Sequence, residues 1–228
     1  MIIPLLLTAS FFQTFIFMDK FLTYCRFQNP YYAIHSLHNA MIVALTAPDV
    51  WITVTDFRNL ESYEPNMMAA YLCFALHFYH IWVYYKSFRF DDWLHHVLMI
   101  GLALPLGLII PSATLLGFSL FFTTGLPGCI DYALLFGVRN GWVRRLTEKR
   151  INKELAVWIR SPGCTAHAAF SLLYICPDAA IERNAAIVVL AVLIFWNGQY
   201  FMQQVVADYA QQLQTISSRV NHEFERVL

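Results

Sequence analysis

Seven long apolar runs set the limits on what this chain can fold into. They are Ile2 to Met18, Ala33 to Thr53, Met67 to Tyr85, Trp93 to Ile110, Thr114 to Val138, Val157 to Ile175 and Ala185 to Ala207. Each run is close to the ~20 residues that an α-helix needs to cross the hydrocarbon core of a bilayer. Lipid offers no partners to backbone amides, and the residue alternation typical of a β-barrel is absent, so we expect helices. The sequence therefore predicts an all-α polytopic membrane protein with seven transmembrane helices.

The composition excludes a soluble domain. Hydrophobic residues make up 58% of the 228 positions and charged residues only 13%, whereas soluble domains carry about 25% charged residues. The 15 basic and 15 acidic residues leave no net charge, so no nucleic-acid partner is expected. We therefore expect membrane lipids to be the main partner of the chain.

The basic residues predict the orientation in the membrane. With seven crossings, successive loops alternate between the two sides, and all of the 15 basic residues except Arg58 and Arg183 fall on one side. This asymmetry is the one that the positive-inside rule describes. We therefore expect the N-terminus on the lumenal or intermembrane side and the C-terminus in the cytosol or matrix. The membrane would be that of the endoplasmic reticulum or the mitochondrial inner membrane.

Six histidines are expected at one depth near the basic side, and they are His35, His38, His77, His80, His95 and His96. The members of the first two pairs are three residues apart, so each pair shares a helix face. The adjacent members of the third pair point about 100° apart, so at most one of them faces the bundle centre. Ionisable groups inside a membrane face the protein interior or a wet cavity. We therefore predict a polar, lipid-binding cavity at this depth, which also includes Asp131, Asn197 and Gln199.

Four short stretches occur in the order and spacing of a known family. They are "AIHSLHN", "DDWLHH", "GCIDYALL" and "FWNGQYFMQQ". Over residues 31–210 the chain thereby resembles the TLC homology family of membrane proteins. The resemblance implies a TLC-like core of six helices over residues 31–210, with residues 1–30 as an N-terminal transmembrane anchor.

The catalytic members of that family are the ceramide synthases, which transfer a fatty acyl group from acyl-CoA to a sphingoid amine. His95 and His96 match the histidine pair of their pattern, and Asp131 matches its second aspartate. Pro127 and Gly128 stand where the family has a histidine and an aspartate. The resemblance implies acyl-CoA as co-substrate, no resident cofactor and no metal. In such an enzyme His96 would act as base or nucleophile and Asp131 would orient it.

Two other readings of the histidines remain open. A di-iron desaturase or hydroxylase would need about eight histidines in HxxxH and HxxHH boxes, whereas this chain has two HxxH pairs and an isolated HH pair. A b-type haem held by histidines of facing helices is also compatible with the first four histidines.

The C-terminal segment predicts an amphipathic helix over residues 211–228. Its apolar residues recur at steps of three and four, and they are Leu213, Ile216, Val220, Phe224 and Val227. Such a stripe needs a membrane interface or a partner protein to cover it. We therefore predict a lipid-accommodating, non-catalytic accessory subunit of a larger membrane complex, which contacts other subunits through residues 209–228 and can hold bound phospholipid. The alternative is a ceramide-synthase-like acyltransferase.

Overall fold

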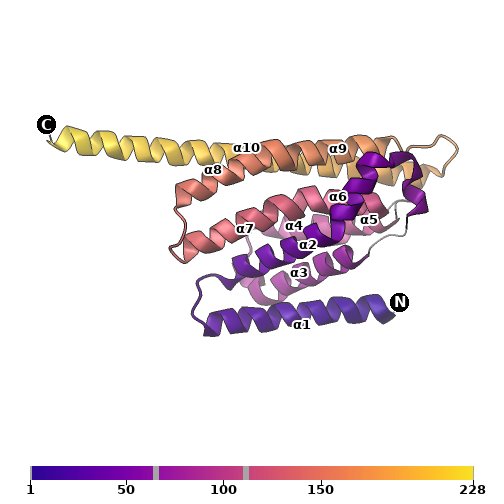
Figure 1. Ribbon diagram of the computed structural model, residues 1–228, viewed down its shortest axis with the longest axis horizontal. Coiled ribbons are helices and arrows are strands. Elements are labelled where there is room, and N and C mark those ends of the chain that lie inside the picture. Colours follow the sequence, from indigo (N-terminus) through magenta and orange to yellow (C-terminus); the bar gives the residue numbers. More distant parts are fainter. Residues whose placement is uncertain (1, 64–66, 110–112, 228) are drawn as a thin grey trace.

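The regular structure of this protein is helical throughout the described residues. The computed structural model describes residues 2–63, 67–109 and 113–227, and no strand occurs within those ranges (Figure 1). Four helical stretches in them are long and apolar enough to cross a membrane. They are α1 (Ile2–Tyr24), α2 (Pro30–Thr55), the stretch Thr114–Arg139, and Ile181–Arg219 within α10 (Ile181–Val227). The expectation of an all-α protein is therefore confirmed for the described residues, and four of its helical stretches fit a membrane-embedded chain.

The other helices do not reach that length and hydropathy by themselves. Helix α3 (Met68–Tyr84) has 17 residues. One continuous rod is formed by α4 (Phe90–Leu98), η3 (Met99–Ala103) and α5 (Leu104–Ile109), and its apolar part is Asp92–Leu108. A second is formed by α8 (Arg145–Leu155), η5 (Ala156–Arg160) and α9 (Ser161–Leu172). The short 3-10 helices η1 (Phe57–Ser62) and η2 (Tyr85–Ser87) lie in the connections.

Three rods contain a wider, π-helical turn, and each turn lies just before a proline. Turn η3 precedes Pro105, η4 (Phe121–Gly125) joins α6 (Ala113–Leu120) to α7 (Leu126–Arg139) and precedes Pro127, and η5 precedes Pro162. Proline lacks an amide proton, and its ring collides with the carbonyl four residues earlier. A locally wider turn moves that carbonyl aside. The rods therefore continue through their prolines without a break.

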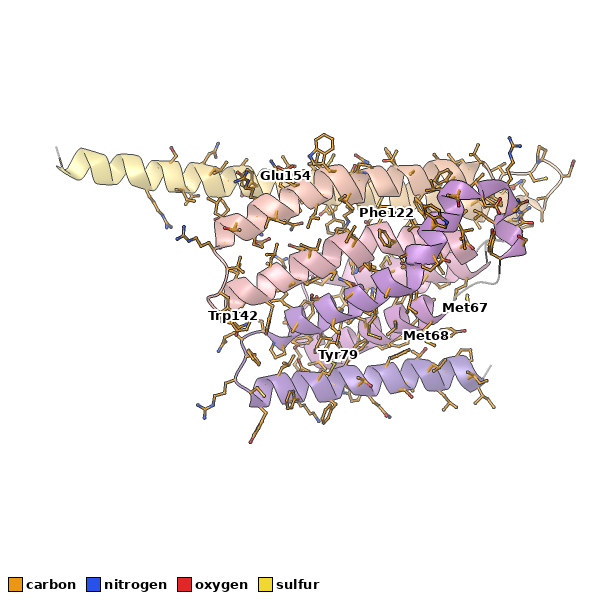
Figure 2. The ribbon with its side chains drawn as sticks, in the orientation of Figure 1. Met67, Met68, Tyr79, Phe122, Trp142 and Glu154 are labelled. Carbon is orange, nitrogen blue, oxygen red and sulfur yellow. The ribbon has the colours of Figure 1, made fainter. Side chains whose placement is uncertain are left out.

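The helices pack side by side into one bundle with two distinct ends (Figure 1). At one end the backbone amide of Gln28 donates to Oδ1 of Asn140 at 3.0 Å, next to Trp142 (Figure 2). At the opposite end Arg183 pairs with Glu61 at 3.8 Å between Nη2 and Oε1. The first end carries the basic loop of residues 139–145, and we call it the basic end.

The N-terminal helix is packed into this bundle. Tyr79 and Tyr84 donate their hydroxyl hydrogens to Oδ1 of Asp19, at 2.9 and 2.7 Å. Phe15 is fully buried and its ring lies 6.0 Å from that of Tyr79, which Figure 2 labels. Helix α1 is therefore joined to α3 by a polar contact as well as by apolar packing.

Several predicted bounds differ from the structure. The rod that contains the run 157–175 begins at Arg145, because the charged α8 continues directly through η5 into α9. The run Trp93–Ile110 starts earlier, at Phe90, and Ile110 lies outside the described residues. Residues 211–227 are not a separate helix, because α10 runs unbroken from Ile181 to Val227. Leu228 and the side chains of residues 220–227 lie outside the described part, so Val220, Phe224 and Val227 cannot be placed.

Candidate functional site

The predicted histidines of α2, α3 and α4 meet near the basic end of the bundle. The rings of His35 and His80 stack with their centroids 4.2 Å apart. His96 lies 5.5 Å from His80 and 5.3 Å from His77. All four of these rings are buried. The structure therefore brings four of the six predicted histidines into one buried cluster.

In three of these histidines a backbone carbonyl of the same helix fixes which ring nitrogen carries the proton. Nδ1 of His35, His77 and His96 each lies 2.7 Å from the backbone carbonyl four residues earlier, at Tyr31, Cys73 and Asp92 respectively. A carbonyl oxygen only accepts, so Nδ1 must be the donor in each ring. In a neutral ring Nε2 is then a hydrogen-bond acceptor. Backbone contacts of this kind leave three imidazole lone pairs free for other partners.

Two tyrosines complete the cluster, and neither was predicted. The ring centroid of Tyr31, in α2, lies 3.9 Å from that of His35. The ring centroid of Tyr132, in α7, lies 4.3 Å from that of His35. Tyr31 precedes His35 by one helical turn, so a search for residues four apart along the same face would have found it. No short-range signal in the sequence connects Tyr132 with the histidines.

The remaining two histidines lie at the edge of the cluster. Nδ1 of His38 is 2.9 Å from Oδ1 of Asn39, and its ring faces Phe15 of α1. His95 is exposed, although its ring centroid is 5.5 Å from that of His77. Of the adjacent pair, only His96 is therefore buried, which is compatible with their separation of about 100° around the helix.

Asp131 does not join the histidines. The charged groups that act on its carboxylate are Glu148, Lys149 and Arg160, which come from α8 and η5. The described contacts of His96 are instead with the rings of His77, His80, Phe88 and His95 and with the carbonyl of Asp92. Among the described contacts His96 and Asp131 do not meet, and the face of α7 that carries Asp131 packs against α8.

Asn197 and Gln199 also bind elsewhere. Nη2 of Arg160 donates to Oδ1 of Asn197 at 3.4 Å. Gln199 donates to the hydroxyls of Ser161 and Thr165, at 3.0 and 3.2 Å. Both residues therefore connect α10 to the rod of α8, η5 and α9. Among the described contacts neither side chain reaches a histidine ring.

Charged residues buried at the α7, α8 and α10 interface were missed by the sequence reasoning. Glu148 is fully buried. Nζ of Lys149 lies 3.4 Å from Oε2 of Glu148 and 2.7 Å from Oδ2 of Asp208. The guanidinium of Arg160 lies 4.2 Å from the ring centroid of Phe201. The positions of Glu148, Lys149 and Arg160 along one helical rod could have indicated that they reach the same interface. Counting the basic residues of each loop, as the orientation prediction does, leaves these positions out.

The described residues hold no group of three or more histidine, cysteine or acidic side chains arranged to bind a metal ion. The imidazole rings face each other in stacked and edge-to-face contacts, rather than with their nitrogens directed at one point. The arrangement in hand is therefore one of hydrogen bonds and ring packing.

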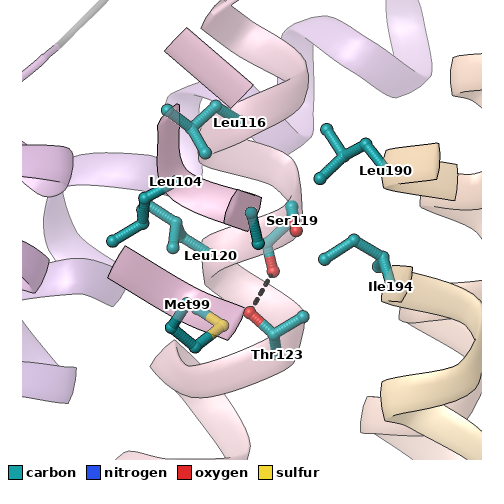
Figure 3. Close-up of a pocket in the computed structure, with 9 residues that line it drawn as sticks. Met99, Leu104, Leu116, Ser119, Leu120, Thr123, Leu190 and Ile194 are labelled. Carbon is teal, nitrogen blue, oxygen red and sulfur yellow. Dashed lines mark hydrogen bonds between the residues drawn. The ribbon is translucent and has the colours of Figure 1, made fainter. Parts of the chain in front are cut away.

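A small apolar pocket lies deeper in the bundle, between the rod of α4, η3 and α5, the rod of α6 and η4, and α10. Figure 3 shows its lining, which includes Met99, Leu116, Leu190 and Ile194. The hydroxyl of Thr123 is turned back to the carbonyl of Ser119, at 2.8 Å. The free volume is about 10 Å³, about enough for one water molecule. An acyl chain would have to displace these side chains to enter.

Comparisons of this chain with protein-family models, with curated proteins and with solved structures give no match. The likeness to the TLC family therefore stays a prediction. Function has to be inferred from the residues and contacts of the chain itself.

Proposed function

We propose that this chain is a TLC-like, seven-span membrane protein that acts as a lipid-accommodating, non-catalytic subunit of a larger membrane complex. Seven crossings are supported by the length of the three less apolar segments. Helix α3 has 17 residues, the rod Phe90–Ile109 is longer, and η5 with α9 continues from Ala156 to Leu172. At 1.5 Å per residue each segment covers ~25 Å or more, close to the thickness of a hydrocarbon core.

The proposed orientation has the basic end in the cytosol or matrix and the N-terminus on the lumenal or intermembrane side. It follows from the positions of the basic residues, which favour the end of the bundle with residues 139–145. Arg183 at the opposite end is paired with Glu61, so one of the two exceptions is electrically compensated. The endoplasmic reticulum and the mitochondrial inner membrane both fit this arrangement.

The observation that carries the accessory role is the length of α10. This helix has 47 residues, or ~70 Å, about twice what a bilayer core requires. Figure 1 shows its C-terminal part leaving the bundle along the direction of the other helices. Leu213 and Ile216 on this extension are each 42% exposed. Since the extension points away from the membrane plane, a partner protein fits its apolar stripe better than a lipid surface does.

The test is native mass spectrometry of the complex extracted gently from its own membrane. We expect stable neighbouring subunits and retained phospholipid with the unaltered chain. The double variant Leu213→Glu/Ile216→Glu should lose the neighbours. The matched variant Gln214→Glu/Ser217→Glu, which adds the same charge on the same exposed helix, should keep them. A chain that is always found alone would contradict the proposal.

Acyl transfer to a lipid amine is the second candidate, because the cluster presents imidazole Nε2 atoms that their own helices hold in the acceptor form. An acceptor imidazole can act as base or nucleophile toward an acyl group. Purified chain would be incubated with acyl-CoA and a long-chain base, and His96→Ala compared with His95→Ala. Turnover that His96→Ala abolishes in folded protein would favour this candidate over the accessory role. Absence of turnover in the unaltered chain would remove it.

A further inference from the structure

The contact between His80 and His96 has a direction that follows from the rest of the cluster. Nδ1 of His80 lies 3.3 Å from Nε2 of His96. Because Nδ1 of His96 donates to the carbonyl of Asp92, the Nε2 of a neutral His96 can only accept. His80 must then donate from Nδ1. Its own Nε2 is left as a lone-pair acceptor.

That last nitrogen is buried and has no partner among the described residues. Nε2 of His80 makes no hydrogen bond, and the residue is 4% exposed. The groups packed around this ring are other aromatic and titratable side chains, namely Tyr31, His35, His77, Tyr79 and His96. Among the described contacts no carboxylate touches the ring of His80 to compensate a positive charge, so burial favours the neutral form that the hydrogen-bond direction requires. A buried acceptor without a donor is unfavourable unless a donor arrives.

We propose that His80 and His96 form a two-imidazole proton relay, which leads from the Nε2 of His80 to the basic end of the bundle. The molecule that it serves is one that brings an O–H or N–H group to His80. The inference stands on hydrogen-bond geometry and does not depend on the accessory or the acyl-transfer role.

The relay moves one positive charge over two rings. The bond between the donor atom of the bound molecule and its hydrogen breaks, the donor atom keeps the electron pair, and the proton joins Nε2 of His80. The Nδ1 proton of His80 then passes to Nε2 of His96. The charge rests on His96, where Nδ1 still donates to Asp92. The carboxylate of Asp92 acts electrostatically on His96, and its side chain is 43% exposed, so a carboxylate near the surface can compensate the charge on His96.

The roles of the two histidines differ in this arrangement. His80 touches the incoming group, whereas His96 fixes the tautomer of His80 and receives its proton. His95, the adjacent residue in the sequence, is exposed and its ring lies 5.5 Å from that of His96, but it makes no hydrogen bond to either relay ring among the described contacts. His95 is therefore the matched control.

The test is nitrogen NMR of the full chain, labelled with ¹⁵N-histidine and reconstituted in lipid nanodiscs. We expect His80 and His96 to be protonated at Nδ1 and not at Nε2, with a scalar coupling across the hydrogen bond from Nδ1 of His80 to Nε2 of His96. A His80 ring protonated at Nε2, or no coupling between the two rings, would overturn the proposal without any variant.

Exchange of the Nδ1 proton of His80 with water then tests the relay itself. In His96→Gln the amide oxygen can still accept from His80 but cannot take up its proton. We expect exchange to slow several-fold in His96→Gln and to stay unchanged in His95→Gln. Equal exchange rates in the unaltered chain and in His96→Gln would show that the proton leaves by another route, and the relay would be rejected.

Discussion

The carboxylate of Asp49 in α2 lies directly against Gly117 in α6. A Cβ atom on residue 117 would overlap this carboxylate. Asp49 is buried, although it lies inside one of the apolar runs. The close approach of α2 and α6 therefore depends on a residue without a side chain, as is common where membrane helices pack tightly.

Replacing Gly117 with alanine should destabilise the bundle. We expect a cost of about 1–3 kcal/mol, as for overpacking in a dense core, because Asp49 has to shift. The measurement is thermal unfolding in detergent, followed by circular dichroism. Gly101→Ala is the control, since a Cβ there would meet no atom within 4 Å, and it should be neutral or slightly stabilising. Equal effects of the two substitutions would refute the close contact.

Removing the carboxylate of Asp19 should loosen α1 from α3. Tyr79 and Tyr84 would both lose the Asp19 carboxylate, and Tyr79 would keep only its long contact of 3.4 Å to the hydroxyl of Tyr84. We expect a loss of about 1–3 kcal/mol in the free energy of unfolding. Asp19→Ala would be compared with Lys20→Ala, an exposed neighbour, which should change stability by less than about 0.5 kcal/mol. Denaturant titration in mild detergent gives both values. Indistinguishable variants would mean that the hydroxyl contacts add nothing.

The contact between Lys149 and Asp208 should hold at neutral pH and fail in strong alkali. Partial burial lowers the pKa of the Lys149 ammonium, but the hydrogen bond to Asp208 and the charges of Glu148 and Asp208 outweigh it and raise this pKa above its usual value of 10.5. A raised lysine pKa contributes stability that is complete below the usual value and is lost as the pH rises through the folded-state value.

Melting temperatures between pH 7 and 11 would check this prediction. The unaltered chain should show an alkaline decrease above about pH 10.5 that is smaller in Asp208→Asn, because that variant has already lost the ion pair. Glu154→Gln removes the exposed pair with Lys153 and should leave the alkaline decrease unchanged. If Asp208→Asn and the unaltered chain respond identically to alkali, Lys149 is not held by Asp208.

The sequence predicts the helices and the histidine cluster because both follow from local rules. Apolar runs become helices in lipid, and residues three apart, such as His77 and His80, keep one face at a known depth. The partner of Asp131 did not follow, because the contact of α7 with α8 depends on tertiary packing between rods. The π-helical turns could not be predicted either. Pro127 indicates a distortion of the helix, but not that a wider turn at 121–125 relieves it.

The full length of α10 could not be predicted from the sequence, because the composition changes near residue 210. Hydropathy falls there, so the run appears to end and a new amphipathic segment appears to start. The backbone has no reason to break, since the segment from Ala207 to Ser218 contains neither glycine nor proline. One helix therefore continues from the apolar environment into the polar one.

In the proposed topology the helices traverse the membrane, so the basic end and the opposite end face different compartments. Two native cysteines mark these ends: Cys25 follows α1 at the basic end, and Cys176 lies between α9 and α10 at the other. Variants that retain only one of them would be labelled with a membrane-impermeant maleimide in sealed vesicles of known sidedness. We expect labelling of Cys25 only from the cytosolic or matrix face and of Cys176 only from the opposite face. Labelling of both cysteines from the same face would contradict the proposed topology.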